Sequence, residues 1–339
     1  MFNIHELIYN LPEQIQDAYD IAQKAKITVR KAHLQNIVIA GMGGSGIGGD
    51  IIQSLTYDYL KIPIVTVKGY NIPGFASRNT LVFAVSYSGN TEETLECFNT
   101  AKKNRCSVIA ITNGGQLLQE CKKYNINYIQ LPKGLPSRAA VGYLFIPLLA
   151  SLSKIKLIPK MDGDIKETIQ ILLKYRRKYN NQARTIAKKL FKMLPMIYST
   201  STLFTSVAKR WQAQFNENAK IICHFNVFSE LNHNEIVGIT DDNPFIPLYY
   251  LILVDPRSHP RNLLRTDLTL QIIKKKLPKT LLTKFFGYKK FYPNGISDLA
   301  RIFSLIMQGD LISFYLARTR GIEPGPILPI DELKEKLKN

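Results

Sequence analysis

Short apolar runs alternate with helical patterns through the first half of the chain. The helical patterns occupy residues 50–60 and 91–105 and a further stretch that ends at Glu120. The apolar runs cover residues 36–41, 62–70, 80–89, 107–114 and 126–132. Apolar strands of this length, separated by helices, predict a parallel sheet that is covered on both faces. Ligands of such sheets bind beyond the carboxyl ends of the strands.

The same alternation returns in the second half, after a shift to polar composition at about residues 154–164. One or two polar helices are predicted from there to Leu194. Strand patterns follow at 195–201, 220–226 and 248–256, with helices at 205–220, 297–321 and 330–338. We therefore expect an α/β fold with two similar domains, residues 1–155 and residues 156–339, the second ending in a helical tail.

The chain is strongly basic: 45 lysines and arginines against 26 aspartates and glutamates give a net charge of +19 over 339 residues. The basic residues are scattered at helical spacing, which favours solvated helix faces over a nucleic-acid surface. No apolar run approaches the roughly 18 residues of a membrane span. The N-terminal segment lacks the pattern of a signal peptide, and the four cysteines lack CxxC spacing. We therefore expect a cytoplasmic protein that binds neither nucleic acid nor membrane.

A glycine-rich segment, GMGGSGIGGD at residues 41–50, connects the first predicted strand to a helix. Its glycines allow the backbone to turn tightly and to approach a ligand closely. The spacing Gly41-x-Gly43-x-x-Gly46 also occurs in dinucleotide-binding proteins, which keeps an NAD-linked oxidoreductase as a hypothesis. That class requires a carboxylate near the end of the second strand, where this sequence has Lys68. The lysine and hydroxyl residue that complete a P-loop are also missing after these glycines.

Hydroxyl groups gather at the end of the third predicted strand. In SYSGNTEET, Ser86, Ser88 and Thr91 lie beside the free N–H groups of a helix N-terminus. Three hydroxyls suit the three terminal oxygens of a phosphate monoester, whereas a simple helix cap needs only one. Arg138, in LPSRAAVGYLF, follows another strand end. It either holds an oxyanion as a planar donor or is a surface arginine at a helix start.

Two ionisable side chains are each flanked by amides. Glu217 lies between two asparagines in NENAK, and His233 lies between two asparagines in ELNHNEIVG. This pattern indicates oriented polar groups in a cleft, with Glu217 as a candidate general base. Glu230 and Glu235 are close to the histidine in sequence, and each of them either orients it or is a surface residue.

Five segments, in this order, carry a resemblance to a known family: GMGGSGIGGD, SYSGNTEET, PSRAAVGYLF, RWQAQFNENAK and ELNHNEIVG. Together they resemble the bifunctional phosphoglucose/phosphomannose isomerases of the phosphoglucose isomerase superfamily, from about Ile37 to Lys334. The resemblance implies two sugar-isomerase (SIS) domains, each a parallel β-sheet flanked by helices in a flavodoxin-like αβα sandwich. It also implies a homodimer that converts fructose 6-phosphate to glucose 6-phosphate or mannose 6-phosphate without metal or cofactor.

The resemblance assigns the residues that bind the substrate. Gly44 and Ser45, in the glycine turn, contact the sugar phosphate or its near end. The family's phosphate cradle is matched by Ser86, Ser88 and Thr91.

The catalytic residues are implied in the same way. Arg138 matches the arginine that stabilises the enediolate, and Glu217 matches the base that moves the proton between C1 and C2. His233 matches the residue that helps to open the sugar ring and that reaches the site from the partner subunit. A lysine near the C-terminus shares in ring opening, and Lys334 is a better match than Lys336.

The sequence departs from the family pattern at Ile239, where a tryptophan is usual, and at Gly325, where a small polar residue such as threonine is expected. These changes leave the core chemistry in place and leave the acceptance of mannose 6-phosphate open. The stretch 255–292 is longer than in compact members of the family.

Two further hypotheses compete with this one. A zinc-dependent mannose phosphate isomerase would need clustered ligands, but the histidines have no paired spacing; they are His5, His33, His224, His233 and His259. A non-catalytic SIS-domain sensor of sugar phosphates is the alternative to an enzyme. Salt-dependent DNA binding would favour the sensor, whereas the presence of both Glu217 and His233 favours catalysis.

Overall fold

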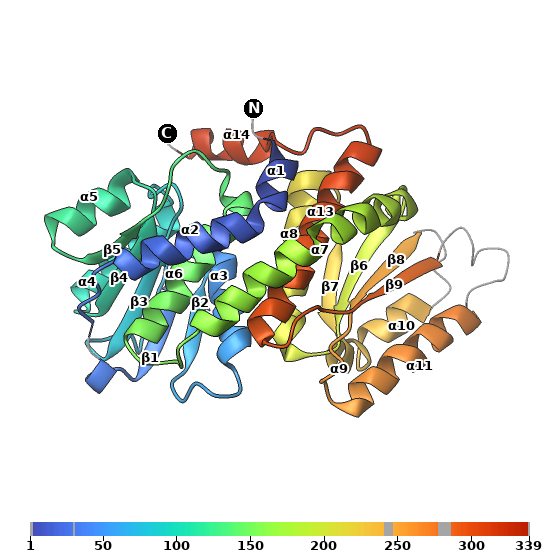
Figure 1. Ribbon diagram of the computed structural model, residues 1–339, viewed down its shortest axis with the longest axis horizontal. Coiled ribbons are helices and arrows are strands. Elements are labelled where there is room, and N and C mark those ends of the chain that lie inside the picture. Colours follow the sequence, from blue (N-terminus) through green and yellow to red (C-terminus); the bar gives the residue numbers. More distant parts are fainter. Residues whose placement is uncertain (1–2, 30, 241–246, 277–285, 338–339) are drawn as a thin grey trace. The chain divides into compact units, whose positions relative to one another are not determined.

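The computed structural model describes residues 3–29, 31–240, 247–276 and 286–337 (Figure 1). The chain divides into two compact units. The N-terminal unit comprises residues 10–174 and 295–303. The C-terminal unit comprises residues 1–9, 175–294 and 304–339.

This grouping differs from a single cut between residues 155 and 156. The division falls inside two continuous helices, α7 (Asp162–Leu190) and α13 (Asp298–Thr319). A helix satisfies its own backbone hydrogen bonds along its whole length. Its two ends can therefore belong to different units without a break in the helix.

The N-terminal unit contains the parallel sheet that the apolar runs predict. Its five strands are β1 (Asn36–Ala40), β2 (Ile64–Val67), β3 (Thr80–Val85), β4 (Ser107–Thr112) and β5 (Asn127–Gln130). They pair in parallel in the order β2-β1-β3-β4-β5. In this order the chain reverses its direction of winding between β1 and β3, and such a switch point leaves a crevice at the carboxyl ends of the strands.

Helices cover both faces of this sheet (Figure 1). Side chains of α4 (Glu92–Lys103) and α5 (Gly115–Lys123) pack on the face that includes Val38 and Val82. On the other face α3 (Gly43–Thr56) approaches Ile39 so closely that a Cβ on Gly49 would lie 3.0 Å from its side chain. α6 (Val141–Lys154) packs against α3 and against α2 (Leu11–Lys24).

The C-terminal unit repeats this plan with four strands. They are β6 (Leu194–Ser199), β7 (His224–Val227), β8 (Leu248–Leu253) and β9 (Phe286–Phe291), all parallel, in the order β7-β6-β8-β9. The two sheets confirm the expected α/β fold. The edge strand β9 lies in the stretch 255–292, for which the sequence pattern predicted no strand.

The faces of this second sheet are covered by different helices. Leu270 and Ile273 of α11 (Pro260–Lys276) pack with α9 (Phe228–Leu231) on the face that includes Ile252. On the opposite face Trp211 of α8 (Thr205–Ala219) meets Phe291, with ring centroids 5.0 Å apart. The Trp211 Nε1 donates a hydrogen bond to the backbone oxygen of Leu305 in α13, at 2.9 Å.

Two helices near the C-terminus differ strongly in burial. α13 is the one helix in the described part of the chain that could cross a membrane by length and composition, and most of its apolar window is buried. A buried core helix passes the same test, so this is weak evidence for a span. The short terminal helix α14 (Leu328–Lys336) differs from α13 in its burial, because none of its residues is buried.

Candidate functional site

The glycine turn between β1 and α3 is held in a conformation that needs glycine. The N–H of Gly41 donates to the backbone oxygen of Val67 in β2, at 3.1 Å. α3 begins at Gly43, whose φ is +47°. A Cβ on Gly46 would lie only 2.3 Å from the oxygen of Gly41. The backbone therefore closes on itself directly above the carboxyl end of β1.

Arg138 lies against this glycine turn. A Cβ on Gly44 would be 2.7 Å from the carbonyl group of Ser137 and 2.8 Å from the nitrogen of Arg138. Arg138 belongs to the 3-10 turn η2 (Ser137–Ala139) and is only 4% exposed. The structure thus excludes the surface arginine considered above: Arg138 is buried, and its backbone lies against the turn.

The hydroxyl-rich loop after β3 is tied together by its own side chains. Ser86 is fully buried; its Oγ hydrogen-bonds to Oγ1 of Thr91 at 2.8 Å and accepts from the N–H of Gly89 at 3.0 Å. Ser88 is exposed, and its Oγ accepts from the N–H of Asn90 at 3.3 Å. Thr91 occupies the N-cap position of α4 but makes no side-chain cap hydrogen bond. A simple helix cap therefore does not account for these hydroxyls.

Two contacts join this loop to its neighbours. Ser45 Oγ, in the glycine turn, accepts from the N–H of Tyr87 at 3.1 Å. Gly89 has a φ of +74°, and a Cβ there would lie 1.8 Å from the oxygen of Gly114. The predicted residues of the N-terminal unit thus come together at the switch point between β1 and β3; they are Gly44, Ser45, Ser86, Ser88, Thr91 and Arg138.

Lys68 is a further cation at this edge that sequence reasoning did not select. It follows β2, and its Nζ forms an ion pair with Asp50 of α3. Its Cε lies 3.3 Å from the position of a Cβ on Gly46. The sequence does carry a signal, a lysine directly at the end of a strand. This lysine lies beside the glycine turn as one half of an ion pair, so its charge is balanced by that of Asp50.

The corresponding edge of the second sheet is built differently. Thr200 follows β6 and Asp255 follows shortly after β8. The N–H of Asp255 donates to Oγ1 of Thr200 at 2.8 Å, and both residues are buried. This edge has hydroxyls and a carboxylate, without the glycines of the first sheet.

Glu217 lies in the last turn of α8 and is half-buried. The buried side of the same helix carries polar groups at a spacing of four residues. Arg210 forms an ion pair with Asp310 of α13 at 2.6 Å, with both side chains 3% exposed. Asn218 Nδ2 donates to Oε1 of Gln214 at 3.2 Å and to Oγ of Ser313 at 3.0 Å.

These buried contacts fix the rotation of α8 about its axis. Side chains four residues apart lie on one helix face, so the buried face leaves Glu217 at its margin. Burial raises the pKa of Asp310, and the neighbouring Arg210 acts in the opposite direction. The pair therefore depends on both of its members, because either one alone would leave a charge in the core.

The end of α8 is closed by residues from the C-terminal segment. Lys220 takes the left-handed conformation, with φ +52°, and its Nζ donates to the oxygen of Pro324 at 3.3 Å. Arg320 donates to the backbone oxygens of Ala219 and Lys220, at 2.7 and 3.1 Å. Cations are favourable at the carboxyl end of a helix. Arg320 thus caps the helix that carries Glu217, although no sequence motif pointed to it.

His233 lies in an exposed turn between α9 and α10 (Glu235–Thr240). Neither nearby glutamate is recorded as bonding to its ring. Glu235 instead accepts from Tyr198 and from Asn226, at 2.6 Å for Asn226, and it pairs with His224 at 2.9 Å. The other glutamate, Glu230, accepts from Asn234 Nδ2 at 2.6 Å. His224, expected to be an ordinary residue, is thus the histidine that Glu235 orients.

Chain order separates Glu217 from His233. Glu217 precedes β7 at the end of α8, whereas His233 follows β7 and α9. Glu217 therefore lies before the N-terminal end of this strand, and His233 lies after its C-terminal end. This arrangement is compatible with the expectation that the histidine of one subunit serves the site of another, which remains a prediction.

Lys334 is exposed on α14. The alternative, Lys336, forms an ion pair with Glu332 at 2.7 Å, four residues earlier on the same helix. Lys334 has no recorded ion pair within the described residues. Its role in ring opening remains a prediction.

The search for metal sites covers only the described part of the chain. Within it, no three side chains of the types His, Cys, Asp and Glu come together as candidate ligands. Ile239, at the position of the usual tryptophan, packs against the core of the second sheet. Gly325 has no φ in the left-handed region, and a Cβ there would lie 3.9 Å from Oε1 of Glu323, an ordinary contact, so a side chain such as that of threonine can begin there.

Comparisons with known proteins agree with this architecture. Residues 179–337 match the family described as bacterial phospho-glucose isomerase C-terminal SIS domain. The C-terminal domain of glucosamine-fructose-6-phosphate aminotransferase from Francisella tularensis has the same fold, with a TM-score of 0.70 and 16% identity. That likeness covers 95% of this chain and 98% of the other.

Full-length relatives are more similar in sequence. The bifunctional phosphoglucose/phosphomannose isomerase of Caldicellulosiruptor bescii is 42% identical over 98% of both chains. The protein of the same name from Thermoplasma acidophilum is 38% identical over 91% of both chains. The resemblance carried by the five sequence motifs is therefore confirmed. This chain belongs to the family of bifunctional phosphoglucose/phosphomannose isomerases, enzymes built from SIS domains.

Proposed function

We propose that this protein is a sugar-phosphate isomerase that interconverts fructose 6-phosphate with glucose 6-phosphate and with mannose 6-phosphate. The observation that carries the proposal is the glycine turn and hydroxyl loop at the switch point of the first sheet, with buried Arg138 against them. This combination offers backbone N–H groups, hydroxyls and a fixed cation to one small anionic substrate. Family membership supports the reaction type.

The phosphate group is held by the loop that contains Ser86, Ser88 and Thr91, beside the turn that contains Gly44 and Ser45. Ser86 and Thr91 are already oriented by their mutual hydrogen bond. A phosphate fixed in this way restricts the position of the sugar carbons, and such orientation lowers the entropic part of the barrier. Binding energy from the phosphate is thus used at the reacting carbons.

The reaction is a proton transfer between neighbouring carbons. Glu217 removes the proton from C2 of the aldose, the C1 carbonyl becomes an enediolate oxygen, and Arg138 stabilises that negative charge. The same carboxyl group then returns the proton to C1, while the hydroxyl proton on O2 moves to O1, giving the ketose. One carboxylate suffices, because both carbons lie on the same side of a planar cis-enediolate.

Ring opening precedes this transfer. His233, supplied by the partner subunit of a homodimer, and Lys334 move protons between the ring oxygen and the C1 hydroxyl of the cyclic sugar. No cofactor takes part, because the oxidation of C2 and the reduction of C1 occur within one substrate molecule. The protein acts in the cytoplasm on soluble sugar phosphates.

A direct test uses purified full-length protein with fructose 6-phosphate in the presence of EDTA. Glucose 6-phosphate and mannose 6-phosphate are resolved by specific coupled assays. Formation of glucose 6-phosphate is expected, and the yield of mannose 6-phosphate determines whether the enzyme is bifunctional. Absence of both products from folded protein that still binds the substrate would contradict the isomerase and favour the sugar-phosphate sensor.

Arg138→Ala is expected to lower kcat by about 10²- to 10³-fold, the usual effect of removing one group that stabilises an oxyanion. Arg138→Lys keeps the charge but lacks the planar donor. Its kcat is expected to lie between those of the wild type and Arg138→Ala. The measurement is kcat and KM for fructose 6-phosphate with both variants, after circular dichroism has confirmed their fold. A change confined to KM would assign Arg138 to substrate binding alone.

A further inference from the structure

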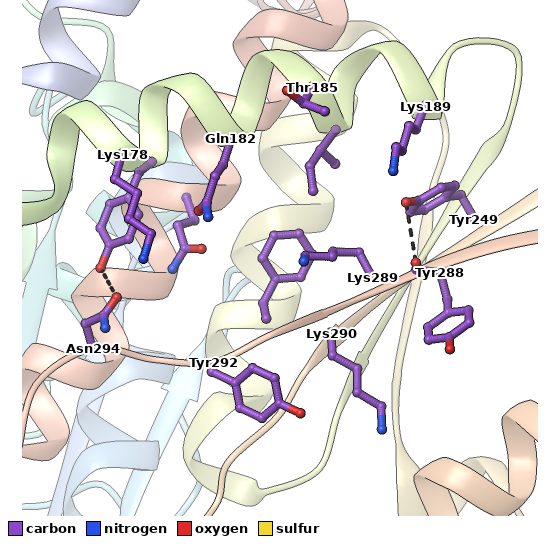
Figure 2. Close-up of a pocket in the computed structure, with 14 residues that line it drawn as sticks. Lys178, Gln182, Thr185, Lys189, Tyr249, Tyr288, Lys289, Lys290, Tyr292 and Asn294 are labelled. Atoms are coloured by element: carbon purple, nitrogen blue, oxygen red, sulfur yellow. Dashed lines mark hydrogen bonds between the residues drawn. The ribbon is translucent and has the colours of Figure 1, made fainter.

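A cavity of about 400 Å³ lies in the C-terminal unit, between α7 and the strands β8 and β9 (Figure 2). It contains none of the residues assigned to the sugar-phosphate site. Its volume is within the range of about 300–1,000 Å³ that is typical of small-molecule sites. A ligand of this cavity can therefore be tested independently of the proposed isomerase activity.

Every side chain of this cavity that carries a full charge is a lysine. Lys178 and Lys189 come from α7, and Lys289 and Lys290 come from β9. No aspartate or glutamate is among the lining residues. Lys290 is neutralised by Asp267 of α11, outside the cavity.

The remaining lysines are available for a ligand. Lys189 and Lys289 have no recorded ion pair within the described residues, and Lys178 has only a cation–π contact with Tyr175, at 5.8 Å. Figure 2 shows Lys178 and Lys189 reaching down from two points along α7 toward β9. Three positive charges without carboxylates favour an anion.

An aromatic ring from β8 lines the cavity on the side that faces α7. It belongs to Tyr249, drawn on the same side of β9 as Lys189 (Figure 2). Tyr288 turns its ring to the other face of the sheet, where Nζ of Lys274 in α11 lies 4.7 Å from its centroid. Tyr249 packs directly on Gly287, where a Cβ would lie 2.6 Å from the ring. Aromatic faces next to amine cations suit a ligand that has both a planar ring and phosphate groups.

Amide side chains complete the lining. Gln182 extends from α7 on the same side of the view as Asn294 (Figure 2), and Gln308 comes from α13. Asn294 Oδ1 accepts a hydrogen bond from Tyr179, at 2.7 Å. Amides offer both donors and acceptors, which the edge of a nucleobase requires.

We propose that this cavity binds a nucleotide, with its base against the ring of Tyr249 and its phosphates near Lys189 and Lys289. A sugar phosphate has no planar ring to place against Tyr249 and is less suited to the cavity. The site would make the protein responsive to a nucleoside phosphate that it does not transform.

The protein contains a natural reporter for this site. Trp211 is its single tryptophan. Its ring is 5.0 Å from that of Phe291, which lines the cavity. Occupation of the cavity is therefore expected to change Trp211 fluorescence, whether or not the enzyme turns over.

The experiment titrates ADP into full-length protein and follows Trp211 fluorescence and the heat of binding. Lys189→Glu and Lys289→Glu are each expected to weaken ADP binding at least about tenfold. Lys188→Glu is the matched control, since it makes the same charge change on α7 at an exposed residue that does not line the cavity. It is expected to change the affinity by less than about twofold.

Glucose 6-phosphate and inorganic phosphate test which part of ADP the protein binds and whether ADP occupies the cavity or the sugar-phosphate site. Saturating glucose 6-phosphate is expected to leave ADP binding unchanged, and inorganic phosphate is expected to bind more weakly than ADP. Absence of ADP binding, or equal losses in Lys188→Glu and Lys189→Glu, would overturn the site. Displacement of ADP by glucose 6-phosphate would assign the binding to the sugar-phosphate site instead. A failure of isomerase activity would leave these binding results unaffected.

Discussion

Glu217→Gln is expected to lower turnover of fructose 6-phosphate by about 10²- to 10⁴-fold while the protein remains folded. Glutamine has nearly the same shape as glutamate but cannot accept the substrate proton. The side chain is half-buried at the margin of α8, and the helix is held by Arg210, Gln214 and Asn218 rather than by Glu217. The fold is therefore expected to tolerate the change.

The decisive measurement separates proton transfer from binding. In deuterium oxide, the wild-type enzyme is expected to exchange the transferred proton of the substrate with solvent, as seen by proton NMR. Glu217→Gln is expected to lose both exchange and product while keeping a similar affinity for the sugar phosphate. Glu230→Gln is the matched control, since the side chain of Glu230 is exposed and accepts from Asn234 Nδ2, a bond that the amide oxygen of glutamine can also accept. If Glu230→Gln lost exchange and Glu217→Gln kept it, the base would be reassigned.

Arg210→Met is expected to reduce the free energy of unfolding of the C-terminal unit by about 3–5 kcal/mol, because it leaves the carboxylate of Asp310 buried without its partner. Both side chains of this pair are 3% exposed, and Arg210 donates to Asp310 at 2.6 Å. The measurement is the urea midpoint of unfolding, followed by Trp211 fluorescence. Because Trp211 is adjacent to Arg210 in α8, the probe reports on this unit.

Two variants test the cause of that loss. Arg318→Met removes the same type of side chain from an exposed pair with Glu323 and is expected to cost less than about 1 kcal/mol. Combining Arg210→Met with Asp310→Leu removes both buried charges and is expected to recover much of the lost stability. Equal destabilisation by Arg210→Met and by the double variant would show that the loss comes from packing and not from an unpaired charge.

The strands were predictable where both of their faces are buried. β1, β3 and β8 are nearly continuous apolar runs, since parallel strands covered by helices need apolar side chains on both sides. β9 was not predicted from the sequence because it is an edge strand with exposed Tyr288 and Lys289, and charged residues are common on edge strands. Its sequence, FGYKKF, does not have the pattern of a buried strand.

The candidate site was predictable in its loops but not in its long-range contacts. Glycine and hydroxyl spacing reflects local backbone requirements, so the turn at Gly44 and the loop at Ser86 could be identified from sequence. The burial of Arg138 against Gly44 and the ion pair of Lys68 depend on which strands become neighbours. Spacing along the chain carries no information about such contacts.

The two sheets share the strand order 2-1-3-4, so the chain contains the same architectural position twice. The first copy combines a glycine turn with hydroxyls, whereas in the second copy the segments 200–206 and 254–260 contain hydroxyls such as Thr200 but no glycine. The second copy also has a carboxylate, that of buried Asp255 just after β8, and a negative charge there disfavours a phosphate. The duplicated scaffold therefore does not repeat the proposed phosphate site, and a sugar bisphosphate is expected to find no equivalent anchor for its second phosphate at the second sheet.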